Sequence, residues 1–172
     1  MENKVIKTIK SRTSTRSYLN KKVPLKKLEA VLEAGKYAPS AMNKQPCNIL
    51  AIRKNSLVKK FHELAMEVAN RECYYGANTL ILVYGPRDDR FTYQDCSCIL
   101  ENMFVAAKAL NIASCWINQF DEFFATPDGI KVKRILGIPD DFMVVGSCAL
   151  GYPSDGIQPS VKPRKDDFIK VL

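Results

Sequence analysis

Side chains that transfer protons are scarce in this sequence of 172 residues. It contains one histidine, His62, which lies off the apolar stripe of an expected helix, so we predict an exposed surface residue. A serine or cysteine nucleophile that relies on histidine as its base has no other candidate. The Asp-Asp pairs at 88–89, 140–141 and 166–167 fall in expected turns or in the tail. An enzyme with so few acid–base groups would depend on a cofactor for its chemistry.

Several familiar motifs are absent as well. The six cysteines form no CxxC pair, so we expect buried free thiols and neither a metal site nor a disulfide framework. Neither GxGxxG nor GxxxxGK[ST] occurs, which argues against a Rossmann dinucleotide site and a P-loop. No apolar run approaches the roughly 20 residues that span a bilayer, and the N-terminus lacks a secretory apolar core. We therefore expect a cytoplasmic protein with no membrane partner.

Acidic residues are scarce in the N-terminal part, where positive charge is concentrated. Nine of the first 27 residues are Lys or Arg and only Glu2 is acidic, within a net charge of +8. This imbalance indicates an anionic partner, either nucleic acid or a ligand that carries phosphate. A basic nucleic-acid-binding module remains an alternative, although no helix-turn-helix pattern or aromatic platform accompanies the charge. We expect no nucleic-acid partner.

Helical and strand patterns alternate along the chain and predict one domain over residues 1–172, of the α/β or α+β class. The residues after Pro153 are expected to be extended. Helices are predicted over 2–11, from Pro24 towards Pro39, and over 56–71, 92–110 and 128–136, and strands over 48–54, 79–85, 113–117 and 142–152.

Two polar segments stand out against this pattern. In "RTSTRSY" (12–18), an extended backbone would place Arg12, Ser14 and Arg16 on one side over roughly 13 Å. An arginine offers a bidentate fork to phosphate, and a serine offers a hydroxyl. In "APSAMNKQPC" (38–47), amide side chains could pair with a carbonyl–NH edge such as that of a flavin pyrimidine.

The order of these motifs resembles the nitroreductase family of FMN-dependent oxidoreductases, almost from end to end. The chain has R-x-S-x-R, then V-P, a helix, A-P-S-x-x-N-x-Q-P, "ALNIASCWINQF" and a K-P-R-K tail. The resemblance implies an α+β fold with a central sheet flanked by helices. It also implies a homodimer with two FMN molecules at the subunit interface and a C-terminal extension that reaches the partner subunit.

The same resemblance implies roles for twelve residues around FMN. Arg12 would bind the phosphate, and Arg16 would lie at the N1/O2 side of the ring. A backbone N–H at 118–119 would donate to flavin N5, and the 39–45 loop would serve in part the partner's flavin. The tail pair would close on the phosphate. The implied FMN-binding set is Arg12, Thr13, Ser14, Arg16, Pro39, Ser40, Asn43, Gln45, Asn118, Gln119, Lys162 and Arg164.

The implied activity is a ping-pong reaction. NADH or NADPH would deliver hydride to the flavin and leave, and a nitro compound, a quinone or a related small oxidant would then take its place. No side chain would need to act as acid or base, and no metal is implied. An alternative is an FMN-binding protein without turnover, which stores flavin or senses redox state; Met42 and the Asn118-Gln119 pair favour it.

Overall fold

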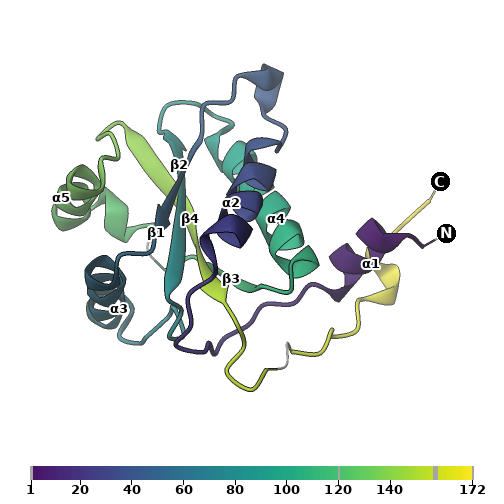
Figure 1. Cartoon of the computed structure of the whole chain (residues 1–172). Helices are drawn as coiled ribbons and strands as arrows, with labels where there is room; N and C mark the ends of the chain where they lie inside the picture. Colours follow the sequence, from purple (N-terminus) through teal and green to yellow (C-terminus); the bar gives the residue numbers. More distant parts are fainter. Residues whose placement is uncertain (1, 120, 157–158, 172) are drawn as a thin grey trace.

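A four-stranded antiparallel sheet forms the centre of the structure, with the strand order β1-β2-β4-β3 (Figure 1). The computed structural model describes residues 2–119, 121–156 and 159–171. The antiparallel pairing and the helices around it confirm the α+β class. The strands are β1 (Asn48–Ile52), β2 (Thr79–Pro86), β3 (Ala113–Ile117) and β4 (Phe142–Gly151).

Helices cover both faces of this sheet. Figure 1 shows α2 and α4 on one face and α3 and α5 on the other. The predicted helices are all present, with ends that differ from the predicted ends by a few residues. None of the described helices is long and apolar enough to cross a membrane. The helices are α1 (Lys4–Ser11), α2 (Leu25–Lys36), α3 (Asn55–Ala69), α4 (Thr92–Ala109) and α5 (Pro127–Leu136), and the 3-10 turns are η1 (Ala41–Asn43), η2 (Phe123–Ala125) and η3 (Asp166–Phe168).

The central strand β2 explains why two apolar clusters form. Leu80 and Leu82 point into the cluster beneath α3 and α5, while Ile81 and Val83 point into the cluster beneath α2 and α4. Successive strand side chains alternate between faces, so a strand covered on both sides reads as a continuous apolar run. The apolar sequence of β2 therefore follows from its central position.

The cysteines and α3 depart in part from the predictions. All six cysteines are free and four are buried, but Cys47 and Cys98 are only half-buried. The apolar pattern of residues 56–71 predicts an inward face made of Leu57, Phe61, Leu64, Ala65 and Val68. Phe61 and Ala65 do face the core, whereas Val68 is 37% exposed. The buried row contains Val58, Phe61 and Ala65, spaced i, i+3 and i+7, so Val68 lies on the flank of that row.

His62 is not the exposed surface residue that the sequence predicted. Its side chain is only 22% exposed, and Nδ1 lies 2.7 Å from Glu72 Oε1. Its Nε2 lies 2.9 Å from the Ala77 carbonyl oxygen. Glu72 also accepts hydrogen bonds from the backbone N–H groups of Tyr74 and Gly76. His62 therefore connects α3, through its two ring nitrogens, to the segment that leads into β2.

Replacing His62 with alanine is expected to lower the free energy of unfolding by about 1–3 kcal/mol, because two hydrogen bonds are lost. Chemical denaturation measures the loss. Glu63→Ala is the matched control, because Glu63 is exposed and forms only a surface ion pair with Lys59. Equal stability of the two variants would contradict a structural role for the imidazole.

Candidate cofactor site

Residues 12–18, here called the basic segment, extend the sheet along the open edge of β3. α1 ends at Ser11, and the next residue, Arg12, has extended dihedrals. Ser14 forms a parallel bridge to Ser114, and the Thr15 N–H donates to the Ser114 carbonyl over 3.0 Å. An edge strand offers unpaired backbone groups, and the basic segment uses some of them here. The extended conformation predicted from the sequence is confirmed for this part of the chain.

Three polar side chains of the basic segment influence the Cys115 thiol of β3. The Ser14 hydroxyl lies within hydrogen-bonding reach of the thiol, and Arg16 and Arg12 both act on it electrostatically. Burial raises the pKa of Cys115, and the two arginines partly offset this rise. Thr15, between them in sequence, is buried. The alternation expected of an extended segment therefore places Arg12, Ser14 and Arg16 in one region.

Arg12 is only weakly engaged within the chain. Its Nε lies 3.8 Å from Glu101 Oε1, and the Arg12 side chain is 24% exposed while that of Glu101 is 56% exposed. A long ion pair with a solvent-exposed partner contributes about 0–1 kcal/mol. The planar guanidinium can therefore bind a phosphate with little loss of stability.

The two threonines of the basic segment carry a further indication of a ligand. Thr13 Oγ1 and Thr15 Oγ1 are buried, and neither has a hydrogen-bond partner among the described residues. Buried polar atoms are nearly always hydrogen-bonded, so these exceptions need an explanation. Phosphate oxygens accept hydrogen bonds from hydroxyl and guanidinium groups alike. Arg12, Ser14 and Arg16 supply such donors on the opposite side of the segment from the two threonines, and that side fits the phosphate of FMN.

Asn118 and Gln119 follow β3 directly and line a cavity of about 460 Å³. Trp116 Nε1 donates to Asn118 Oδ1 over 3.2 Å, which holds the Asn118 side chain at the end of the strand. Phe120, the last residue of the "ALNIASCWINQF" motif, lies outside the described residues. Because β3 carries the basic segment on its edge and residues 118–119 at its end, the fold brings these two predicted groups together.

Residues 39–47, here called the 39–47 loop, lie at the other edge of the sheet because they lead into β1. Strands β2 and β4 separate β1 from β3, a width of about 14 Å at 4.7–4.9 Å per strand. Within one chain the predicted loop residues Pro39, Ser40, Asn43 and Gln45 are therefore on the opposite edge from the basic segment. Their predicted role towards a partner's flavin stays a prediction.

The conformation of the 39–47 loop is strained. Met42, Asn43 and Gln45 have φ values of 54°, 54° and 52°, in the left-handed region. This conformation costs roughly 1–2 kcal/mol for a residue other than glycine. Hydrogen bonds hold it, from Ala41 N–H to Asp95 Oδ1 (3.0 Å) and from Gln45 N–H to Ser40 Oγ (2.9 Å). Strain maintained in this way is typical of ligand-binding loops.

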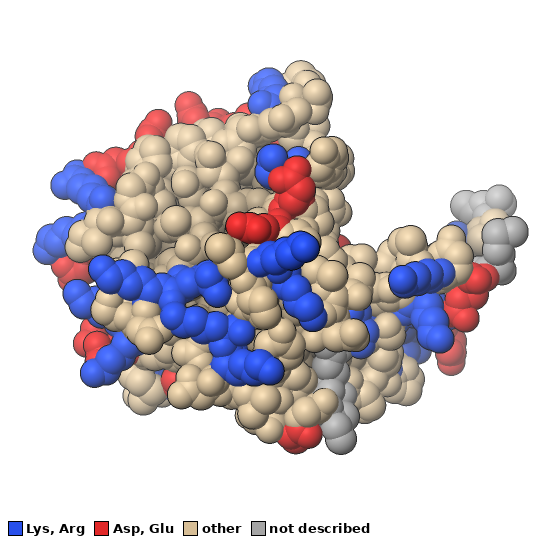
Figure 2. Space-filling view, in the orientation of Figure 1, with Lys and Arg blue, Asp and Glu red and all other residues tan. Residues whose placement is uncertain are grey.

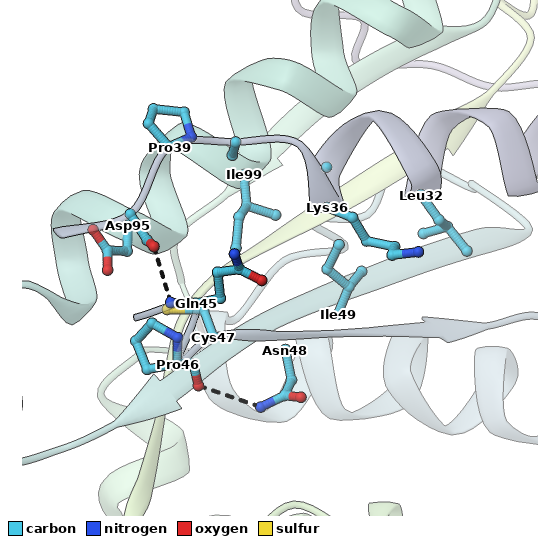
Figure 3. A pocket seen from close by; sticks show the side chains of 13 residues that line it. Leu32, Lys36, Pro39, Gln45, Pro46, Cys47, Asn48, Ile49, Asp95 and Ile99 are labelled. Carbon is cyan, nitrogen blue, oxygen red and sulfur yellow. Dashed lines mark hydrogen bonds between the residues drawn. The ribbon is translucent and has the colours of Figure 1, made fainter. Parts of the chain in front are cut away.

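Figure 3 shows the cavity beside this loop, which measures about 340 Å³. Gln45 and Cys47 face it from the loop, Ile49 faces it from β1, and Leu32 and Lys36 face it from α2. Gln45 Nε2 donates to Asn43 Oδ1 over 2.9 Å, so the two predicted amides bind each other in this chain.

Lys162 and Arg164 lie in the exposed tail, which extends away from the sheet in Figure 1. Neither side chain forms an ion pair or a hydrogen bond with the residues that the structure describes. Residues 157, 158 and 172 of the expected extended tail lie outside the described residues. The predicted closure of the pair on a phosphate stays a prediction.

Much of the positive charge lies elsewhere on the surface. Figure 2 shows a band of Lys and Arg side chains over α3 and the start of α2. The net charge of +8 is therefore spread over the surface and is not confined to the basic segment.

Asp121 is a residue of this region that the sequence did not single out. It lines the cavity beside Asn118 and Gln119, and its Oδ1 is buried with no partner among residues 2–119, 121–156 and 159–171. Burial raises the pKa of its carboxyl to about 7. A single acidic residue after a strand forms no recognisable sequence motif, so Asp121 is identified only by its burial in the structure.

The antiparallel sheet flanked by helices agrees with the fold that the nitroreductase resemblance implies. The model of the Nitroreductase family matches residues 9–74 and 58–152, and the chain belongs to this family. This finding confirms the resemblance identified from the motifs.

Individual relatives agree with the family assignment. A protein of Archaeoglobus fulgidus, provisionally named NADH dehydrogenase/NAD(P)H nitroreductase, is 30% identical over 155 residues, which cover 87% of this chain and 86% of the relative. A Bacteroides fragilis nitroreductase solved with bound FMN is 34% identical, with a TM-score of 0.93 over 99% of this chain and 100% of that chain. A nitroreductase with bound FMN from Desulfitobacterium hafniense shares the fold, with a TM-score of 0.89 at 23% identity over 100% of both chains.

Proposed function

We propose that this protein is an FMN-dependent oxidoreductase that uses NADH or NADPH to reduce nitro compounds, quinones or related small oxidants. One observation carries the proposal. Arg12, Ser14 and Arg16 share one side of the extended basic segment at the β3 edge, where all three influence the Cys115 thiol. The family assignment and the FMN bound to the Bacteroides fragilis relative support it.

Each part of the site has a separate task in this proposal. Arg12 binds the phosphate through its guanidinium fork, and Thr13 and Ser14 donate hydroxyl hydrogen bonds. Arg16 contributes a positive charge that favours the anionic reduced ring. The backbone at Asn118 and Gln119 orients the ring next to the cavity beyond β3. Bound FMN supplies the hydride chemistry, which no side chain of this protein can provide.

We propose further that the protein acts as a homodimer. Exposed apolar side chains on α1 and the tail support a second copy, since α1 buries no residue within the chain. Val5 and Ile9 are 61% and 50% exposed, and Phe168 is 81% exposed. A partner would cover them and could bring its own 39–47 loop to the basic segment. Lys162 and Arg164 would then close on the phosphate.

Anaerobic stopped-flow spectroscopy of the FMN-loaded protein tests this function. NADH or NADPH is expected to bleach the flavin absorbance promptly, and a quinone should restore it. Because the nicotinamide nucleotide leaves first, steady-state rates at several oxidant concentrations should give parallel double-reciprocal lines. FMN that binds but is bleached by neither nucleotide would contradict the enzyme and favour the flavin-storage alternative. A colourless protein with salt-sensitive oligonucleotide binding would favour the nucleic-acid alternative.

A further inference from the structure

Asp121 occupies a position between two cavities at the end of β3. The larger, of about 460 Å³, is shared with Asn118, Gln119 and Tyr93 of α4. The smaller, of about 220 Å³, is lined also by Arg87 and Phe124. The Asp121 N–H donates to the Asn118 carbonyl over 3.4 Å, which fixes a turn directly after the residues assigned to the flavin ring. Asp121 is therefore an acidic side chain beside the proposed reaction centre.

The surroundings of this carboxyl favour its protonated form. Oδ1 is buried and has no hydrogen-bond partner in the described part of the chain. An unpartnered buried oxygen disfavours the charged form, because nothing replaces its lost hydration. Burial raises the pKa of Asp121 to about 7, and the negative charge of Glu122 adds to the rise. Asp121 therefore holds a proton in the acidic half of the physiological pH range.

Three further ionisable side chains surround Asp121. Tyr93 faces it from α4, and Arg87, which follows β2, faces it from the smaller cavity. Tyr74 also interacts electrostatically with Asp121, and its hydroxyl donates to Ser147 Oγ over 3.2 Å. Among the described residues, Arg87 is the one cation that lines either cavity.

We propose that Asp121 is the proton donor to the oxidant that binds in the larger cavity. This inference rests on the proposed function. Two-electron reduction of a quinone consumes one hydride and one proton and gives the hydroquinone. The reduced cofactor supplies the hydride. The Asp121 O–H bond breaks, its proton forms an O–H bond on the quinone oxygen, and the carboxylate then regains a proton from water.

The two half-reactions differ in their need for this proton. Hydride transfer from NADH or NADPH to oxidised flavin gives the anionic reduced form without a proton donor. Only the step that reduces the oxidant consumes a proton. Asp121 should therefore affect the oxidative half-reaction and leave the reductive half-reaction unchanged.

Stopped-flow measurement of both half-reactions in the FMN-loaded protein tests this role. With a quinone as oxidant, the wild-type oxidative rate is expected to fall as pH rises through about 7. Asp121→Asn should lower this rate about 100-fold at acidic pH and abolish its pH dependence, since general acids contribute 10²–10⁴-fold. Glu122→Gln removes the neighbouring charge that adds to the raised pKa of Asp121, so it should keep the wild-type rate at acidic pH and move the fall in rate to lower pH. An unchanged oxidative rate in Asp121→Asn would overturn the proposal.

The proton itself can be measured without turnover. The pKa of Asp121 is raised from 3.8 to about 7 in the folded protein, so the folded state binds the proton more tightly than the unfolded state. The resulting stabilisation is fully present below about pH 4 and is lost as pH rises towards 7. The melting temperature of the FMN-free wild type, relative to Asp121→Asn, should therefore decrease over this range. A constant difference would overturn the proposal, whereas flavin that neither nucleotide bleaches would overturn the proposed function instead.

Discussion

Replacing Arg12 with alanine is expected to weaken FMN binding by about 1.5–3 kcal/mol, because a charge-assisted phosphate contact is lost. This corresponds to a rise in the dissociation constant of roughly 10- to 150-fold. The free protein should lose only about 0–1 kcal/mol, because the one ion pair of Arg12 with the described residues is the 3.8 Å contact to solvent-exposed Glu101. Fluorescence titration of the FMN-free protein with FMN measures the change.

Riboflavin separates a phosphate contact from a general loss of the site. It lacks the phosphate, so wild type and Arg12→Ala should bind it equally well. Arg71→Ala is the matched control, because Arg71 is an exposed arginine between α3 and β2. If Arg12→Ala and Arg71→Ala bind FMN equally tightly, the basic segment does not hold the phosphate.

The replacement of Lys133 by methionine is expected to cause the largest loss of stability. Lys133 is fully buried, and its Nζ donates to the carbonyl oxygens of Asp140 (2.9 Å) and Phe142 (2.7 Å). Burial lowers the pKa of this ammonium group. Methionine would fill the space of the stem but leave both carbonyls without their donor. We expect a loss of about 3 kcal/mol in the free energy of unfolding.

The effect of Lys133→Met should extend to the site, because residues 140–142 lead into β4 and Met143 lines the smaller cavity beside Asp121. Urea denaturation measures the stability. Lys131→Met on the same helix is the control, since Lys131 is exposed and pairs only with exposed Asp128. That variant should stay within about 0.5 kcal/mol of wild type. A similarly small loss for Lys133→Met would contradict the interpretation of its two hydrogen bonds.

Helices and strands were predictable from the sequence where their buried residues recur with the period of a helix or a strand. The apolar run of β2 indicates a buried strand, and the helical spacing of Cys96, Met103 and Ala107 indicates the buried face of α4. Both patterns can be recognised from residues that are neighbours in sequence. Lys133 and His62 were not predictable in this way. Their partners lie on other segments, and residue type alone indicates a surface position for both.

The site was predictable only in its separate pieces. The alternation of side chains in the basic segment predicted that Arg12, Ser14 and Arg16 lie on one side. The pairing of this segment with β3 joins residues far apart in sequence, so it was not predictable. The left-handed conformation of Met42 has no signal, since methionine does not favour it. Asp121 became visible only through the burial of one oxygen atom. The sequence therefore indicated which groups bind, and the fold showed where they meet.

The visible spectrum of the purified protein tests the central claim most directly, that the basic segment holds the phosphate of a flavin. The protein, saturated with FMN and then passed over a desalting column, should be yellow. Acid precipitation should release one FMN molecule per protein chain. Protein that stays colourless after this treatment would contradict the account.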